Sequence, residues 1–320
     1  MGPPLPACIA SEGVEAMTAQ PPHVIVSFDM ETDLGNWWVT YDGVRLGTPA
    51  ILEVLARHGI PATFLFTADA ATASPESVSD VLAAGCEVGC HGLHHEFLGE
   101  ANSDTPGIFT LLPEEIDHRL ELATEIVGRI SGVAPVSFRC PRLQGSNQVL
   151  EALRRLGYMA DSSYPTYYYA KQLGPYYPHR DDWREAGDLP VLEMPLFADF
   201  TAELADPDDP FKRERDCWPR LRLEGGERFK QRVDRMGGYL RERGLPVFVC
   251  LYLHPWEFVP TPQVLSFGEG RLEVAEWLWK NSGAAHLAAL DELIGLLRHD
   301  GATFWSMKDY AAAWRRGEVS

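Results

Sequence analysis

Short apolar runs alternate with helical patterns along most of this chain, and that alternation restricts the fold more than any other feature of the sequence. The predicted strands span residues 23–29, 61–66, 86–91, 135–139, 158–161, 191–195, 246–254 and 302–307. Helical patterns begin near residues 48, 74, 113, 146, 226, 286 and 309. Because parallel strands require crossover helices, the chain is expected to have an α/β fold with a parallel sheet.

About seven parallel strands in 320 residues fit one closed or nearly closed barrel better than two separate domains. An open, doubly wound sheet is the alternative, and periodicity does not separate the two. Residues 1–22 are interpreted as a poorly ordered N-terminal tail and residues 23–320 as a single domain. Two segments rich in aromatic, Pro and charged residues, 162–188 and 199–225, are expected to form long functional loops over the C-terminal face of the barrel.

The charge of the chain excludes nucleic acid and anionic membranes as partners, since 28 Lys+Arg stand against 46 Asp+Glu and the formal charge is −18. No uninterrupted apolar run is long enough to span a bilayer. Six cysteines in a chain of this length do not indicate a disulfide scaffold, and Cys86 and Cys90 are expected to be buried thiols rather than zinc ligands. Reduced cysteines and the lack of a signal-peptide pattern predict a cytoplasmic protein.

Reactive side chains gather at the ends of the predicted strands. They are Asp29 with Glu31 and Asp33 just beyond it, His91 with His95, Arg139, Asp161 and His254. The carboxyl ends of parallel strands meet at one edge of a sheet or barrel, and in such folds that edge holds the active site. The sequence therefore predicts one active site built from these residues.

A metal site is predicted within this set. His91 and His95 are four residues apart, so both imidazoles share one face if the segment turns helically. A carboxylate from Glu31 or Asp33 would complete two imidazoles and one carboxylate, which is typical of a catalytic site with positions open to water and substrate. This donor set suits zinc, while nickel, cobalt or iron would fit a more open site.

Five segments, SFDMETD, CHGLHHE, FRCPR, DSSY and LYLH, occur in this order and resemble the five motifs of the polysaccharide deacetylase family, also described as the NodB homology domain or carbohydrate esterase family four. The resemblance covers about residues 23–310 and implies a distorted (β/α) barrel with hydrolase activity on an amide. The first motif resembles a divergent branch in which Asp-x-Glu replaces an adjacent Asp-Asp pair.

The resemblance also implies which residues hold the metal and activate water. Glu31, His91 and His95 would be the metal ligands, with Asp33 as the second choice for the carboxylate. One divalent ion, preferably Zn²⁺, would activate the attacking water and polarise the acyl carbonyl. Asp29 would be the general base that takes the proton of that water.

The remaining motif residues are implied to assist proton transfer. Arg139 would hold Asp29 ionised, because a nearby cation favours the carboxylate. His254 would protonate the departing nitrogen, and Asp161 would orient the His254 ring.

Three departures from the family motifs bear on the substrate. Gly92 stands where the second motif usually carries a hydroxyl, Arg142 where the third often carries an aromatic residue, and Tyr164 replaces Trp in the fourth. Flat side chains near the strand ends can stack on sugars or wall a small pocket. The residues expected to contact the substrate are Trp38, Pro141, Tyr164 and Trp256. The expected substrate is a carbohydrate or a compact small molecule from which an acyl group, preferably acetyl, is removed.

Two other functions stay open at this point. One is an imidase or allantoinase-type hydrolase of small C–N bonds on the same scaffold. The other is a carbohydrate-binding pseudoenzyme, which would predict a broken catalytic set, whereas the set here looks intact. The sequence does not decide the oligomeric state, and a homo-oligomer is left open.

Overall fold

The computed structural model of the protein describes residues 21–35, 38–99, 111–206, 208 and 213–319, so most of the predicted tail lies outside the described residues. The strands are β1 (His23–Met30), β2 (Thr63–Phe66), β3 (Glu87–Cys90), β4 (Ser137–Phe138), β5 (Ala160–Asp161), β6 (Leu192–Glu193), β7 (Phe248–Leu253), β8 (Val264–Phe267), β9 (Gly270–Glu273) and β10 (Thr303–Trp305). The longer helices are α1 (Thr48–His58), α2 (Ala68–Ala73), α3 (Pro75–Ala83), α4 (Pro113–Ser131), α5 (Asn147–Leu156), α8 (Gly226–Arg241), α10 (Ala284–His299) and α11 (Met307–Arg315). Short helical turns are η1 (Gly43–Gly47), η2 (Pro141–Leu143), α6 (Thr166–Tyr169), α7 (Arg220–Glu224), η3 (Pro255–Phe258) and α9 (Glu276–Trp279).

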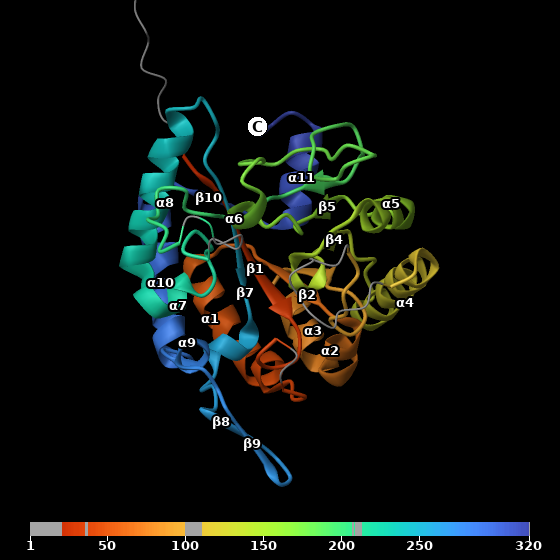
Figure 1. Ribbon diagram of the computed structural model, residues 1–320, viewed down its shortest axis with the longest axis vertical. Helices are drawn as coiled ribbons and strands as arrows, with labels where there is room; N and C mark the ends of the chain where they lie inside the picture. Colours follow the sequence, from red (N-terminus) through yellow and green to blue (C-terminus); the bar gives the residue numbers. More distant parts are fainter. Residues whose placement is uncertain (1–20, 36–37, 100–110, 207, 209–212, 320) are drawn as a thin grey trace, which may run out of the picture.

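Eight of the described strands form one curled sheet whose neighbouring strands are all parallel (Figure 1). The order is β10-β1-β2-β3-β4-β5-β6, and β7 pairs with β1 as well. Beyond β6, the amide of Phe197 donates to the carbonyl of Cys250 in β7 at 2.9 Å, so the two ends of the sheet approach each other. Helices surround the sheet (Figure 1). The prediction of a distorted (β/α) barrel is confirmed, with eight strands rather than about seven.

The register of the sheet places the site residues at one level. Phe28 of β1 pairs with Leu253 of β7, so the next residues along these strands, Asp29 and His254, reach the same edge. Cys90 pairs with Phe138, which does the same for His91 and Arg139. The strands are buried on both faces, as expected for a parallel sheet covered by helices. The pairing of strands, rather than any local sequence spacing, thus brings the motifs together.

Some helix ends follow the start and stop signals of the sequence, whereas Ser74 makes no side-chain cap at the start of α3. Ser146 caps α5 by accepting a hydrogen bond from the amide of Val149 at 3.2 Å, and Gly59 ends α1 in the left-handed region at a φ of 60°. Thr48 does not cap α1, because the chain is already helical through η1. A side chain at Gly43 in η1 would collide with Trp256, since its Cβ would lie 2.3 Å from the Trp256 nitrogen. The η1 turn therefore supports the loop that follows β7.

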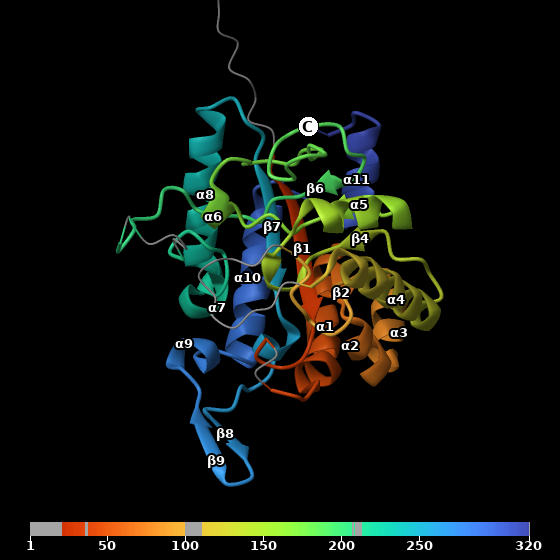
Figure 2. The same cartoon turned by 45° about the vertical axis from the view of Figure 1, so that its right-hand side comes forward.

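An antiparallel hairpin formed by β8 and β9 lies outside the barrel, between β7 and α10 in the chain (Figure 2). No strand is predicted over residues 255–285, because this stretch has no apolar run long enough to mark a buried strand. Of the eight strand residues in the hairpin, Leu265 alone is buried. The hairpin therefore lacks the core-facing pattern on which strand prediction depends.

Two properties of the described residues bear on the class of protein. Within them, no helix combines the length and apolarity needed to cross a membrane. Cys86, Cys90, Cys140, Cys217 and Cys250 are buried free thiols. Because neither Cys86 nor Cys90 belongs to a group of metal-binding side chains, they pack as small apolar residues, as predicted.

Candidate active site

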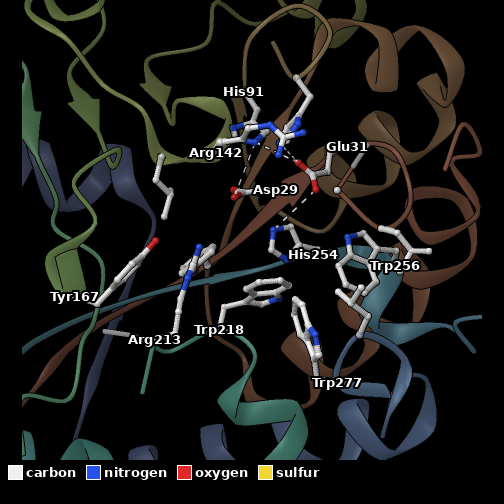
Figure 3. A pocket seen from close by; sticks show the side chains of 16 residues that line it. Asp29, Glu31, His91, Arg142, Tyr167, Arg213, Trp218, His254, Trp256 and Trp277 are labelled. Atoms are coloured by element: carbon white, nitrogen blue, oxygen red, sulfur yellow. Dashed lines mark ion pairs between the residues drawn. The ribbon is translucent and has the colours of Figure 1, made fainter. Parts of the chain in front are cut away.

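A cavity of about 320 Å³ opens at the carboxyl ends of the strands (Figure 3). Its lining includes Asp29, Glu31, His91, His95 and His254, five of the residues predicted from the strand ends. They come from β1, from the loops after β1 and β3, and from the end of β7. The two other predicted site residues, Arg139 and Asp161, are fully buried beneath or beside this cavity. The structure thus gathers most of the predicted site in one place.

Glu31, His91 and His95 form a buried group of metal-binding side chains. Oε2 of Glu31 lies 2.5 Å from Nε2 of His95 and 3.5 Å from Nε2 of His91. Nδ1 of His91 donates to the carbonyl oxygen of Arg139 at 2.8 Å, which leaves the lone pair of a neutral imidazole on Nε2. Within the described part of the chain, Nε2 of His91 and Oε2 of Glu31 have no hydrogen-bond partner.

The two histidines converge through a tight loop and not through a helix. Gly92 has a φ of 83° and His95 a φ of 60°, so the chain turns back between them. The ring centroids are 5.3 Å apart. A side chain at Gly92 would also press on Pro141 at 3.1 Å. Glycine at the hydroxyl position of the second motif is therefore required by the backbone here, and the expected helical turn is wrong.

These residues fit a divalent metal ion. Two imidazoles and one carboxylate are the donors of many catalytic zinc sites, and buried lone pairs without hydrogen bonds are what such an ion would use. Burial raises the pKa of Glu31, but the positive charge of His95 and the close contacts of Glu31 with both histidines outweigh burial and bring this pKa well below its usual range. Glu31 is therefore an ionised ligand candidate.

Asp33 does not join this group. Its carboxylate accepts hydrogen bonds from the hydroxyl of Thr40 at 2.5 Å and from the amides of Asp42 and Gly43 at 3.0 and 2.8 Å. These bonds close the loop after β1 and direct the carboxylate away from the histidines. Of the two carboxylates left open by the sequence, the structure favours Glu31 as the ligand.

Asp29 and Arg139 form a buried ion pair, as the sequence analysis expects. Nη1 of Arg139 donates to Oδ1 of Asp29 at 2.6 Å, and Nη2 donates to the hydroxyls of Ser27 and Ser162 at 2.8 and 3.1 Å. The other oxygen of Asp29 lies 4.0 Å from Nε2 of His91, on the side of the cavity. Arg139 therefore fixes the orientation of Asp29 and leaves one carboxylate oxygen open to the metal-binding group.

His254 is held by Glu257 and not by Asp161, which corrects the sequence-based expectation. Nδ1 of His254 donates to Oε2 of Glu257 at 3.2 Å, and Oε1 of Glu257 accepts a hydrogen bond from Nε of Arg222 at 2.8 Å. Glu257 and Arg222 are fully buried. Nε2 of His254 faces Glu31 at 3.9 Å from Oε1. The imidazole is thus anchored through one nitrogen and presents the other to the metal-binding group.

The charge of His254 follows from these neighbours. Burial lowers the pKa of His254, but the hydrogen bond to Glu257 and the negative charge of Glu31 outweigh burial and raise this pKa to about 9. Burial raises the pKa of Glu257, but the hydrogen bond from His254 and the nearby positive charges lower it to about 2. At neutral pH the pair is therefore an imidazolium beside a carboxylate.

Asp161 belongs to a separate buried cluster. Its Oδ1 accepts hydrogen bonds from the amide of Ser162 at 2.9 Å and from the hydroxyl of Ser163 at 2.6 Å. Glu193 lies beside it, and among the described residues neither Oδ2 of Asp161 nor Oε2 of Glu193 has a hydrogen-bond donor. Burial raises the pKa of Asp161 to about 6, while burial and the charge of Asp161 hold the pKa of Glu193 well above its usual range. This pair therefore retains a proton at neutral pH.

Only one of the four predicted substrate contacts lines the cavity. Trp256 does so, with its ring stacked on His254 at a centroid distance of 5.6 Å. Tyr164 is fully buried among other aromatic residues, which corrects the expectation. Pro141 is buried against Gly92, and Trp38 borders a smaller neighbouring cavity. Pro141 and Trp38 are not placed to contact a substrate in the main cavity, because both side chains pack against the backbone or neighbouring loops.

Several cavity residues were missed by the sequence analysis. Tyr167 and Trp218 come from the two segments expected to cover the barrel mouth, and Trp277 comes from the unassigned stretch before α10 (Figure 3). Trp218 packs edge-on against His254 at 5.3 Å and against Trp277 at 5.5 Å. Their spacing relative to the motifs carries no signal, because only the folded loops bring them to the cavity. An excess of aromatic residues in these loops was the available clue.

Part of this chain is similar to proteins of a known family. Residues 20–160 match the model of the polysaccharide deacetylase family. Peptidoglycan-N-acetylmuramic acid deacetylase PdaA of Bacillus subtilis is 30% identical over 124 residues, which is 38% of this chain and 43% of that protein. The chain spans less than half the length of the curated relatives that it matches.

Solved structures share the fold over almost the whole chain. A Mycobacterium smegmatis protein described as a polysaccharide deacetylase is 18% identical with a TM-score of 0.60, and the match covers 95% of this chain and 96% of that one. Puue allantoinase is 15% identical with a TM-score of 0.60, with coverage of 97% and 98%. These similarities show a common fold. The family match covers the segment that holds Asp29, Glu31, His91 and His95.

Proposed function

We propose that this protein is a metal-dependent hydrolase that removes an acyl group, preferably acetyl, from the amide nitrogen of a sugar or compact small molecule. The observation that carries this proposal is the buried group of Glu31, His91 and His95 with Asp29 and His254 beside it in one cavity. A zinc ion held by the three ligands would lower the pKa of a water molecule and polarise the acyl oxygen. The name of the curated relative, an amide deacetylase of an amino sugar, supports the same reaction class.

Asp29 is suited to be the general base. Its contact with Arg139 fixes its orientation, and its second oxygen faces the metal-binding group. A base must be within hydrogen-bond reach of the water whose proton it takes, and this geometry allows it. Arg139 lies behind Asp29 and is a positioning residue, since its guanidinium is fully buried and does not line the cavity.

His254 is suited to be the general acid. Its imidazolium carries a proton at neutral pH and presents Nε2 to the cavity, while Glu257 holds Nδ1. Amines are poor leaving groups unless they are protonated, so this proton is needed at the nitrogen when the C–N bond breaks. The aromatic rings of Trp218 and Trp256 on either side restrict the rotation of the imidazole.

Metal analysis with matched variants tests the proposal. Purified protein loaded with Zn²⁺ is expected to hold about one equivalent and to deacetylate N-acetylglucosamine or a short oligomer of it, and chelation should abolish turnover. Glu31→Gln and His91→Ala should lose the metal, whereas Asp33→Asn should keep it. A content below about half an equivalent of any transition metal per protein, with no activation when a metal is added, would contradict the proposal. An arm with allantoin tests the imidase alternative directly.

A further inference from the structure

Two arginines line the cavity, and they differ in how their charge is balanced. Nη1 of Arg213 donates to Oδ2 of Asp216 at 2.7 Å, and its guanidinium lies over the Tyr167 ring at 4.9 Å from the centroid. Arg142 is not part of an ion pair with any carboxylate in the described ranges. Its guanidinium lies over the ring of Phe97 at 4.7 Å from the centroid. Arg142 is therefore the cavity cation that retains the capacity to bind an anion.

The backbone holds Arg142 at the cavity under strain. Arg142 and Leu143 both have a φ of 58°, a left-handed conformation that costs free energy for residues with a side chain. Pro141, just before them, is buried against Gly92 and fixes the turn. Such strain persists only where surrounding packing imposes it, and it concentrates at ligand-binding positions. The turn directs a long cationic side chain beside the histidines of the metal-binding group (Figure 3).

The positive charge of Arg142 lies in a protein that is negatively charged overall. The protein carries a formal charge of −18, and Glu31 is the charged group that acts most on Arg142. When Glu31 serves as a metal ligand, the metal compensates its charge, and the guanidinium of Arg142 has no remaining counterion. A guanidinium without a counterion at a cavity favours an oxyanion, and its planar pair of N–H donors matches a carboxylate.

We propose that Arg142 binds a carboxylate carried by the substrate, so that the cavity selects compact amides with an acidic substituent over neutral ones. This inference rests on the proposed function for the identity of the reacting amide. A carboxylate is favoured over a phosphate dianion, because the carboxylate of Asp29 lines the same cavity and would repel the second charge. Arginine at this position, where the family motif often has an aromatic residue, then marks a change of substrate preference.

Equilibrium binding to the zinc-loaded protein tests this contact without requiring turnover. The probes are N-acetylglycine, N-acetyl-β-alanine and 4-acetamidobutanoate, each compared with its primary amide, so that the spacer between amide and carboxylate varies. At least one acid is expected to bind about tenfold or more tightly than its amide, as for a charge-assisted hydrogen bond. In Arg142→Gln this ratio should fall to near one, and in Arg142→Lys it should be intermediate. Arg228→Gln, which removes the same charge from an exposed position on α8, should keep the wild-type ratio.

Other outcomes would overturn the proposal. If no acid is preferred by the wild-type protein, or if the preference survives in Arg142→Gln, the carboxylate does not bind at Arg142. Equal losses for acid and amide would show that Arg142 acts on the amide common to both. Tighter binding of N-acetyl-O-phosphoethanolamine than of every acid, lost in Arg142→Gln, would show that the site takes phosphate instead.

A turnover arm keeps this proposal separate from the proposed function. If the zinc-loaded protein deacetylates the preferred acid, Arg142→Gln should raise KM for that acid by about tenfold or more with a smaller effect on kcat. If it hydrolyses neither acid nor amide while the binding preference depends on Arg142, the proposed function fails and the anion site stands. If it hydrolyses acid and amide equally and binds them equally, the proposed function stands and the anion site at Arg142 fails.

Discussion

Nδ1 of His254 lies 3.2 Å from Oε2 of Glu257, three residues further along the chain. Glu257 also accepts the amide hydrogen of His254 at 3.1 Å, so the carboxylate fixes both the ring and the backbone of this residue. Arg222 holds the other oxygen of Glu257 and, through Nη2, the carbonyl of Trp277 at 2.8 Å. One buried carboxylate thus connects the proposed acid to the aromatic wall of the cavity.

Glu257→Gln is expected to lower kcat by about 10- to 100-fold while KM and zinc content stay close to wild type. The reason is that Gln offers Nδ1 of His254 a weaker and uncharged partner, which loosens the ring and reduces its protonation. Steady-state kinetics in a cycle with His254→Ala measures the coupling. In the background of His254→Ala, Glu257→Gln should have little further effect on kcat.

Asp161→Asn serves as the control for this assignment. Asp161 contacts Ser162 and Ser163 and not His254, so this variant should reduce kcat less than Glu257→Gln does. A larger loss in Asp161→Asn would restore Asp161 as the residue that orients the acid. Glu257→Gln removes the charge that pairs with buried Arg222, and such a loss can itself destabilise the protein by about 3–5 kcal/mol. Urea denaturation of each variant therefore accompanies the kinetics.

Asp29→Asn is expected to lower kcat by about 10²- to 10⁴-fold with zinc content near wild type, because Asp29 is assigned to proton transfer and not to the ligand group. Asn retains an oxygen that can accept the hydrogen bond from Arg139, so the cavity should stay formed. Metal analysis of the purified variant is the decisive measurement. If zinc is lost together with activity, Asp29 is a ligand and the base must be another group.

The contacts that the sequence predicts correctly are those imposed by strand pairing. Asp29 and Arg139 are 110 positions apart, yet Asp29 lies at the end of β1 and Arg139 directly follows β4, and parallel pairing brings the ends of such strands to one edge. The convergence of Glu31 with His91 has the same origin. Residues at the carboxyl ends of strands are predictable because the hydrophobic pattern marks where each strand stops.

The contacts that the sequence does not predict depend on loop conformation. Glu257 reaches His254 only because η3 turns the chain back on itself, and Trp277 reaches the cavity because Arg222 binds the carbonyls of Trp277 and Lys280. Tyr164 illustrates the opposite error, since an aromatic residue beside a motif is buried in the aromatic cluster under its own loop. No periodic pattern records any of these arrangements.

Glu193→Gln is expected to make stability less dependent on pH. Because the pKa of Glu193 is raised in the folded protein, folding retains a proton that the unfolded chain releases above about pH 4.5. The free energy of unfolding of the wild type should therefore fall as the pH rises above this value. Gln can donate a hydrogen bond to Asp161 without holding a titratable proton, so the variant should lose this pH-dependent contribution to the free energy of unfolding.

Urea denaturation of wild type and Glu193→Gln at pH 5 and pH 8 gives the comparison. The free-energy difference between wild type and variant should shift in favour of the variant at the higher pH. Taking the difference removes the contribution of titrating groups outside the pair of Asp161 and Glu193, which both proteins share. A difference that is the same at both pH values would show that Glu193 is ionised in the folded protein.

The final prediction concerns the length of the substrate. Tyr167, from the segment 162–188, and Trp218, from the segment 199–225, line the cavity, and Trp277 lines it beside Trp218 with the two rings packed edge-on. The cavity volume of about 320 Å³ is at the lower end of small-molecule sites, which span about 300–1,000 Å³. Stiff aromatic walls around so small a space should admit one sugar-sized amide and obstruct a polymer chain.

Along a ladder of N-acetylglucosamine oligomers, kcat/KM is therefore expected to be highest for the shortest substrates and to fall with length. Trp277→Ala should relax this limit and raise kcat/KM for the trimer relative to the monomer, because the Trp277 ring is half exposed and can be removed without opening the core. Phe267→Ala, which removes a similarly exposed aromatic ring from the hairpin outside the cavity, should leave the length profile unchanged. If kcat/KM rises steadily with chain length in the wild type, the cavity continues into an open groove and the aromatic residues are sugar-binding platforms along it instead of a barrier.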